Sequence, residues 1–217
     1  MTATATLSRE LRADAQRNRL RILEAARELI AEQGVDVPVT GIAERAGVGV
    51  GTIFRRFPTK DDLLIAVVEQ RAEHLLEAAG AAAASDEPGP ALRLFMQTAV
   101  SLQICDRGFC DAMDSNLFAS VTLRRLFKQV VASAGDLLAR AQAAGDVRGD
   151  VTAEDITMIL AGIVRSGLIL EDTVPGAWRR YLDLALDGLR PEGATPLSGT
   201  APTRRQFEAA HRAARHA

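Results

Sequence analysis

The chain has 217 residues, and its 26 Lys and Arg against 28 Asp and Glu give a formal net charge of −2. Its 47% hydrophobic and 25% charged residues are ordinary for a folded protein and exclude wholesale disorder and a collagen-like chain. No charge-free run reaches the roughly 18 apolar residues that a membrane helix needs, and the N-terminus lacks the pattern of a signal peptide. We therefore expect a cytoplasmic protein that does not contact a membrane.

Cysteine usage and catalytic motifs argue against several classes of protein. Cys105 and Cys110 form neither a disulfide framework nor a paired metal motif; we interpret them as buried thiols, with redox-active thiols as the alternative. The sequence has no nucleophile elbow, no phosphate-binding loop, no dinucleotide-binding glycine pattern and no His/Cys metal cluster. We accordingly expect no enzyme, no bound metal and no cofactor.

Charge is distributed unevenly along the chain. Residues 1–60 carry ten Lys and Arg against seven Asp and Glu, whereas residues 61–217 carry sixteen against twenty-one. A basic front end on an acidic body indicates a polyanion-binding module joined to a second module, although chance variation between solvated faces gives similar numbers. A motif is needed to decide between these interpretations.

Helical periodicity predicts an all-α protein. Leu20, Leu23 and Ile30 recur at helical spacing before Gly34, which suits the C-terminal cap of a helix over residues 17–33. The polar residues 1–16 are expected to form a flexible arm or an early extension of that helix. Further helices are expected at 38–45, 50–57, 60–79, 91–104, 117–144, 152–170 and 175–188, with a loop at 80–90 and an interrupted segment at 105–116.

The segment 38–60, PVTGIAERAGVGVGTIFRRFPTK, has the layout of a helix-turn-helix, in which a tight turn joins two short helices. Gly47 permits the backbone conformation of the turn. Gly49 and Gly51 leave the start of the second helix uncluttered, so that it can enter a DNA major groove with its amide groups near phosphate. The apolar residues that would face inward are Ile42, Ala43, Val48 and Ile53.

The run from Arg17 to Leu64 resembles the DNA-binding domain of TetR-type transcriptional repressors. The resemblance rests on Ile42–Val48, on Gly51–Phe54, and on Phe57, Lys60, Leu63 and Leu64. Residues 141–148 and 181–191 look like actinobacterial members of the same family. The resemblance implies a three-helix DNA-binding domain at 17–62 and a helical ligand-binding and dimerisation domain at 63–189. The Gly-, Pro-, Thr- and Ser-rich composition after Pro191 predicts a flexible basic tail at 190–217, with an extra DNA or dimer contact as the alternative.

The resemblance also implies which side chains touch double-stranded DNA. Val50 takes a base-reading position, where an apolar side chain favours a thymine methyl group. Thr52 matches a phosphate-binding hydroxyl, and Phe54 replaces the Tyr that is usual in the family. Either Arg55 or Arg56 could contact a guanine. The complete predicted set is Thr40, Gly49, Val50, Gly51, Thr52, Phe54, Arg55, Arg56 and Lys60. Arg17, Arg19 and Arg21 are either phosphate contacts or a solvated face.

The second domain is expected to form a homodimer. One small reading helix makes few contacts, whereas two copies about 34 Å apart can read a palindromic operator. The helices at 152–170 and 175–188 are apolar around much of their circumference, which indicates burial on more than one side; burial in one monomeric core is the alternative. The predicted dimer interface contains Ile159, Ile163, Gly167, Trp178, Leu182 and Leu186.

The same domain is expected to enclose a pocket for an unknown small-molecule effector. Aromatic and Met side chains supply adaptable apolar surface, although ordinary core packing explains the same residues. The predicted pocket residues are His74, Phe95, Met96, Phe109, Met113 and Phe118.

Together these observations predict a repressor that an effector releases from a palindromic operator. An activator, or a regulator controlled by a partner protein, is the alternative within this class. An enzyme with a vestigial helix-turn-helix and a non-specific nucleoid protein are alternatives of other classes. The missing catalytic motifs count against the enzyme, and the net charge of −2 counts against the nucleoid protein.

Overall fold

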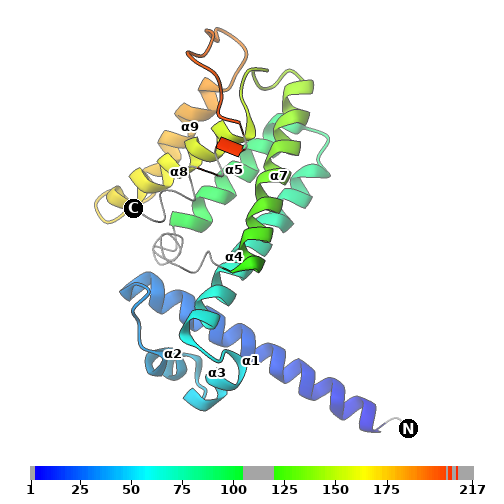
Figure 1. Ribbon diagram of the computed structural model, residues 1–217, viewed down its shortest axis with the longest axis vertical. Coiled ribbons are helices and arrows are strands. Elements are labelled where there is room, and N and C mark those ends of the chain that lie inside the picture. Colours follow the sequence, from blue (N-terminus) through cyan, green and yellow to red (C-terminus); the bar gives the residue numbers. More distant parts are fainter. Residues whose placement is uncertain (1–2, 105–119, 204, 207–208, 210–217) are drawn as a thin grey trace.

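The structure, a computed structural model, describes residues 3–104, 120–203, 205–206 and 209, and the side chains of the first helix from residue 14 onward. Over these residues it contains helices and no strands, so the predicted all-α fold is confirmed. The helices form two groups, one above the other, which the long α4 (Lys60–Ala83) joins (Figure 1). The predicted interrupted segment 105–116, with both cysteines, lies outside the described residues.

Three helices precede α4 and build the lower group: α1 (Ala3–Gln33), α2 (Val39–Ala46) and α3 (Val50–Arg56). The predicted cap ends α1, since Gly34 has a φ of +82° and its N–H donates to the Ile30 carbonyl at 2.8 Å. Residues 3–16 belong to α1 and do not form the flexible arm that was one of the two expectations for this segment. They extend the first helix, as the other expectation has it, because no Gly or Pro interrupts residues 3–33.

The start of α4 agrees with the sequence pattern. The Asp62 N–H donates to Thr59 Oγ1 at 3.1 Å, and the Thr59 N–H donates back to Asp62 Oδ2 at 3.0 Å. This reciprocal capping box satisfies two backbone donors that a helix start would otherwise leave without partners. The position of Lys60 at the first turn follows from it.

The loop between α4 and α5 (Pro88–Ile104) covers only residues 84–87, shorter than the predicted 80–90. Residues 81–83 are alanines, which favour a continued helix. Arg140 stabilises the end of α4 by donating to the Ala83 carbonyl at 2.6 Å and the Ser85 carbonyl at 2.7 Å. At the start of α5, Asp146 Oδ2 accepts the Gly89 N–H at 2.9 Å. Both contacts join segments far apart in sequence, which the local pattern does not reveal.

The upper group is completed by α7 (Val121–Ala143), α8 (Ala153–Leu170) and α9 (Trp178–Gly188). Ser120 caps α7, and a second capping box of Thr152 and Asp155 starts α8. The last helix begins three residues later than predicted. Pro175 and Gly176, whose φ is +76°, form a turn before it.

Each group has its own hydrophobic core, and α4 contributes to both. The lower core takes Leu63 to Val68 of α4, and the upper core takes Leu75 to Ala82. The start of α7 also enters the lower core, where Leu123 is 0% exposed. The change from one core to the other therefore occurs inside a continuous helix and not at a linker.

The chain after α9 forms no helix over residues 190–203, and these residues are exposed. The Arg148 N–H donates to the Leu189 carbonyl at 2.9 Å, and its guanidinium donates to the Thr195 carbonyl at 2.5 Å. This part of the predicted flexible tail is thus held against the connection between α7 and α8. Most of the basic residues beyond it lie outside the described residues.

Gly167 provides a test of the packing in the upper core. A Cβ at this position would lie 2.6 Å from Ile104 Cδ1 and 3.0 Å from Trp178 Cβ. We expect Gly167→Ala to lower the free energy of unfolding by about 1–3 kcal/mol, because the added methyl overpacks the contact. Denaturant unfolding followed by circular dichroism measures the change.

Gly80→Ala in α4 is the matched control, since nothing lies within 4 Å of a Cβ there. It should raise the free energy of unfolding by up to about 1 kcal/mol through helix propensity alone. Equal stabilities of the two variants would contradict the close approach at Gly167.

Candidate nucleic-acid interface

The turn between α2 and α3 has the geometry that its glycine predicts. Gly47 has a φ of +63°, in the left-handed region. Its N–H donates to the Glu44 carbonyl at 3.1 Å, and the Val48 N–H donates to the Ala43 carbonyl at 3.0 Å. This pair of bonds is a Schellman motif, which ends α2 and sets the direction of α3.

The Arg21 side chain, from α1, stabilises this turn by hydrogen bonds. Its Nη2 donates to the carbonyls of Ala46, at 2.5 Å, and Gly47, at 3.3 Å. A Cβ on Gly47 would lie 2.9 Å from the same nitrogen, so the guanidinium in this position would have to shift beside any other residue. Arg21 thus has a structural role, while Arg17 pairs with Asp14 one turn away.

The recognition helix α3 has one buried face and one exposed face. Ile53 and Phe57 are buried in the lower core, and the half-buried Val50 packs against it. At about 100° per residue, Gly51 and Arg55 lie almost opposite Ile53, whereas Arg56 lies much nearer to its side. The predicted DNA-binding residues of α3 and its cap that are exposed are Gly49, Gly51, Phe54, Arg55 and Arg56.

Arg55 lies along the exposed surface of its own helix. Its Nε donates to the Gly51 carbonyl at 3.2 Å, and its Nη2 donates to Thr52 Oγ1 at 3.1 Å. Both bonds are exposed to solvent, so exchanging them for contacts with DNA costs little. The guanidinium is therefore held beside the predicted phosphate-binding hydroxyl and above the open surface of Gly51.

Two predicted residues lie on the neighbouring helices. Thr40 is exposed in the first turn of α2, and Lys60 is half-buried in the first turn of α4. Their helices meet α3 at the lower end of the molecule, remote from α8 and α9 (Figure 1). The predicted set thus comes from three helix starts around one exposed surface.

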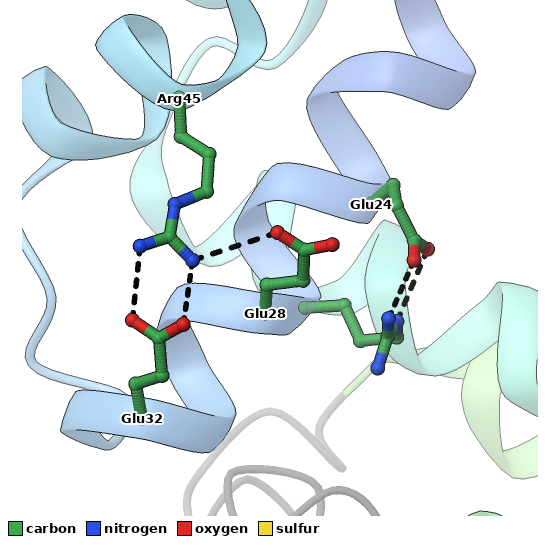
Figure 2. A network of polar contacts seen from close by, with 5 residues as sticks. Glu24, Glu28, Glu32 and Arg45 are labelled. Atoms are coloured by element: carbon green, nitrogen blue, oxygen red, sulfur yellow. Dashed lines mark hydrogen bonds and ion pairs between the residues drawn. The ribbon is translucent and has the colours of Figure 1, made fainter.

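Ion pairs hold α2 against α1 behind this surface (Figure 2). The Arg45 guanidinium makes a bidentate contact with Glu32, in which Nη1 donates to Oε1 at 2.6 Å and Nη2 donates to Oε2 at 3.0 Å. Its Nη1 also donates to Glu28 Oε2 at 3.5 Å. The hydrogen bond from Arg45 lowers the pKa of Glu32, and Glu32 raises the pKa of Arg45 in return. On the same face of α1, the hydrogen bond from Arg27 lowers the pKa of Glu24.

Three of the six predicted pocket residues lie within the described part of the chain, and none of these three lines the cleft described below. Phe95 and Met96 are buried in the upper core, where they pack as ordinary core residues, and His74 is exposed on α4. Phe109, Met113 and Phe118 lie outside the described residues. Hydrophobic pattern predicts burial but does not distinguish the wall of a cavity from a filled core.

A cleft of about 400 Å³ does lie between α5 and α9, and the sequence analysis missed most of its residues. Polar side chains at helical spacing on the otherwise apolar α5 were the available signal. The lining residues are Gln97, Thr98, Ser101, Leu102, Trp178, Arg179, Leu182 and Asp183.

The predicted dimer interface requires a correction. Five of its residues are buried within the core of this chain, and Ile159 is partly buried against it, so they are not available to a second chain. The monomeric-core alternative explains them. The buried five are Ile163, Gly167, Trp178, Leu182 and Leu186.

Other apolar residues of the same region are exposed. On α8, Met158 and Ile169 are 54% and 80% exposed, and on α9 Leu184 is 58% exposed. Small exposed residues, Ala161 and Gly162, lie between the two on α8. Helix α8 has apolar residues both on the face that packs in the core and on the face exposed to solvent. The hydrophobic pattern therefore predicted burial on more than one side, but it could not tell which residues face the core of the same chain.

Two searches of the described residues concern other kinds of site. In the ranges that the structure describes, no group of three His, Cys, Asp or Glu side chains could hold a metal ion. Among the described helices, none has the length and apolar character to span a bilayer.

The braced turn, the exposed short helix and the separate helical body define a helix-turn-helix DNA-binding protein. Residues 22–67 match the family described as bacterial regulatory proteins, tetR family. Residues 87–191 match the C-terminal domain of SbtR-like transcriptional regulators. The chain belongs to the TetR family of bacterial transcriptional regulators, as a DNA-binding member.

Individual relatives agree with this assignment. The chain is 38% identical to a TetR regulatory protein of Mycobacterium vanbaalenii, with a TM-score of 0.65, over 83% of this chain and 99% of that one. It is 31% identical to a TetR regulator of Streptomyces coelicolor, with a TM-score of 0.66, over 81% and 99%. An HTH-type regulator of Staphylococcus aureus is 41% identical over 61 residues, so the match spans 28% of this chain and only 33% of that relative.

The ion pair between Arg45 and Glu32 predicts a pH dependence. Because the pKa of Glu32 is lowered in the folded state, its stabilising effect is present above the ordinary Glu pKa of about 4.3 and is lost as the pH falls through the lowered value. We expect Arg45→Gln to lower the melting temperature at pH 7, and this difference from the wild type to be smaller at pH 3.

Arg56→Gln is the matched control, because it removes the same charge from an exposed residue of α3. Its melting temperature should follow the wild type at both pH values. A difference for Arg45→Gln that stays constant from pH 7 to pH 3 would contradict the role of the ion pair.

Proposed function

We propose that this TetR-family protein is a repressor that binds a palindromic operator as a homodimer and is released by a small-molecule effector. The observation that carries this proposal is the placement of an exposed reading helix and a separate helical body at opposite ends of α4. A repressor of this kind acts on bacterial DNA, which places it in the cytoplasm. The physical steps are DNA reading, pairing of two chains and release.

For DNA reading, we assign the base contact to Arg55. It points away from the core in the last turn of α3, with Gly51 leaving open surface one turn earlier. Arg56 lies nearer the core side, which suits a phosphate of the groove wall. Val50 at the helix start would face a thymine methyl group, and the Thr52 hydroxyl would bind phosphate. Thr40 and Lys60 would contact the backbone on either side.

Substitution of the two arginines separates their roles. Arg55→Ala should weaken operator binding by about 1–3 kcal/mol and relax the preference at one base pair of each half-site. Arg56→Ala should weaken binding to all sequences alike and reduce the salt dependence by about one counterion per half-site. Selection of bound genomic fragments followed by fluorescence anisotropy measures both; identical sequence preferences of Arg55→Ala and the wild type would overturn the assignment.

For pairing, we propose the exposed apolar surface of α8 and α9 as the dimer interface. The exposed apolar side chains Met158 and Ile169 lie on one face of α8, with the exposed Arg165 between them. Exposed apolar side chains that gather on one face and are accompanied by a charged group are typical of an interaction site. Ala161, Gly162 and Ser166 are exposed and small, which suits close approach of a second copy of α8. On α9, Tyr181 and Leu184 extend the same surface. Two chains paired there would present two reading helices to a palindrome.

Charge placed on this surface tests the pairing. Ile169→Glu should shift the protein from dimer to monomer and weaken operator binding at least tenfold, because a carboxylate would be buried without a partner. Light scattering after size-exclusion chromatography gives the mass. Leu94→Glu is the control, since Leu94 is 62% exposed on α5, away from this surface; a dimeric Ile169→Glu protein would contradict the proposed interface.

For release, we propose that α4 transmits the effector signal. An effector can lower DNA affinity only by its differential affinity for two conformations, typically about 1–3 kcal/mol of coupling. A rotation of α4 would move its lower end, with Lys60 and the attached α3, relative to the second chain. A compound that releases the labelled operator in an anisotropy screen supports this; an operator complex that requires a bound compound to form would favour the activator alternative.

A further inference from the structure

The cleft between α5 and α9 has the volume of a small-molecule site. About 400 Å³ lies at the lower end of the range that ligand pockets occupy. Its floor is apolar, formed by Leu102, Leu182 and the edge of Trp178. Its two walls are polar and come from different helices.

The wall on α5 offers hydrogen-bonding groups without protein partners. Gln97 and Ser101 stand one helical turn apart, so their side chains share a face. Both residues are partly buried, and among the described residues neither side chain has a hydrogen-bond partner. Thr98 differs, because its hydroxyl donates to the Leu94 carbonyl at 2.9 Å. An amide and a hydroxyl are thus available to a ligand.

The wall on α9 presents a cation, the exposed Arg179. The Arg179 guanidinium lies 4.6 Å from the centre of the Trp178 ring, within the range of a cation–π contact. Its other side touches Gly176, where a Cβ would collide with Nη1. Among the described residues that line the cleft, the one carboxylate is that of Asp183, and it already faces Arg93 at 3.4 Å. The local balance of Arg93, Arg179 and Asp183 is therefore one positive charge.

The cleft is separate from the proposed dimer surface. At about 100° per residue, Arg179 and Asp183 lie roughly opposite Tyr181 and Leu184 around α9. A second chain packed on the latter pair would leave the cleft open to solvent.

We propose that this cleft binds a small organic carboxylate with an apolar body. The carboxylate would pair with Arg179, whose planar fork matches its two oxygens. The Gln97 amide and the Ser101 hydroxyl would donate to the remaining lone pairs of the same carboxylate, and the apolar body of the ligand would lie on Leu102 and Leu182. The effector role of such a ligand rests on the proposed function; its binding does not.

Binding can be measured because Trp178 is the only tryptophan of the chain. Benzoate, phenylacetate and hexanoate serve as probes, and benzamide serves as the neutral counterpart of benzoate. At least one carboxylate should change the Trp178 emission in a saturable way, and benzamide should bind at least tenfold more weakly than benzoate. Failure of all three carboxylates to bind at 10 mM would overturn the proposal.

Variants test whether the ligand sits in the cleft. Arg179→Gln should weaken binding at least tenfold and Gln97→Leu several-fold, with ligand-detected NMR as the readout, because Arg179→Gln itself alters the tryptophan environment. Arg180→Gln is the matched control, since Arg180 is the exposed neighbour outside the cleft. Equal weakening by Arg180→Gln, or none by Arg179→Gln, would overturn the site.

The operator complex separates this proposal from the proposed function. A carboxylate that binds the cleft and releases the operator supports both. A carboxylate that binds the cleft without releasing the operator would overturn only the effector role of the ligand. A carboxylate that binds the cleft of a protein without preference for any operator would overturn only the proposed repressor function. Circular dichroism of each variant confirms that a loss of binding is not a loss of fold.

Discussion

The continuity of α4 is the constraint on which the rest of the structure depends. One helix enters two hydrophobic cores, through Leu63 to Val68 below and Leu75 to Ala82 above. Its ends are fastened by contacts of different kinds, the capping box of Thr59 at one end and Arg140 at the other. Because a helix bends little over this length, a displacement in the upper core moves the lower one.

In the lower domain, arginine side chains fix α2 and the turn that follows it against α1. Arg21 braces the turn, and Arg45 ties α2 to α1 through Glu32. Leu123 of α7 adds a second connection between the domains, beside that of α4. Both connections end in one small core, and close packing makes such a core resist gradual deformation.

Local chemistry explains why the helix-turn-helix was predictable. The glycine of the turn, the cap of α4 and the periodicity of α3 each act over a few residues, so sequence spacing is enough to derive them. The dimer and pocket residues were assigned less well for the opposite reason. Trp178 and Leu182 look the same in sequence whether they face their own core or a second chain, and Phe95 looks the same beside a cavity or in a filled core.

The sequence by itself determined an all-helical protein with a helix-turn-helix, because helical period, caps and a left-handed glycine are properties of neighbouring residues. Only the tertiary structure decided which face of α8 is inward, where the first core gives way to the second, and that Arg21 supports the turn. It also brought Gln97 and Ser101 opposite Arg179, 78 or more positions away along the chain. Such juxtapositions depend on how whole helices pack, and no local pattern encodes that packing.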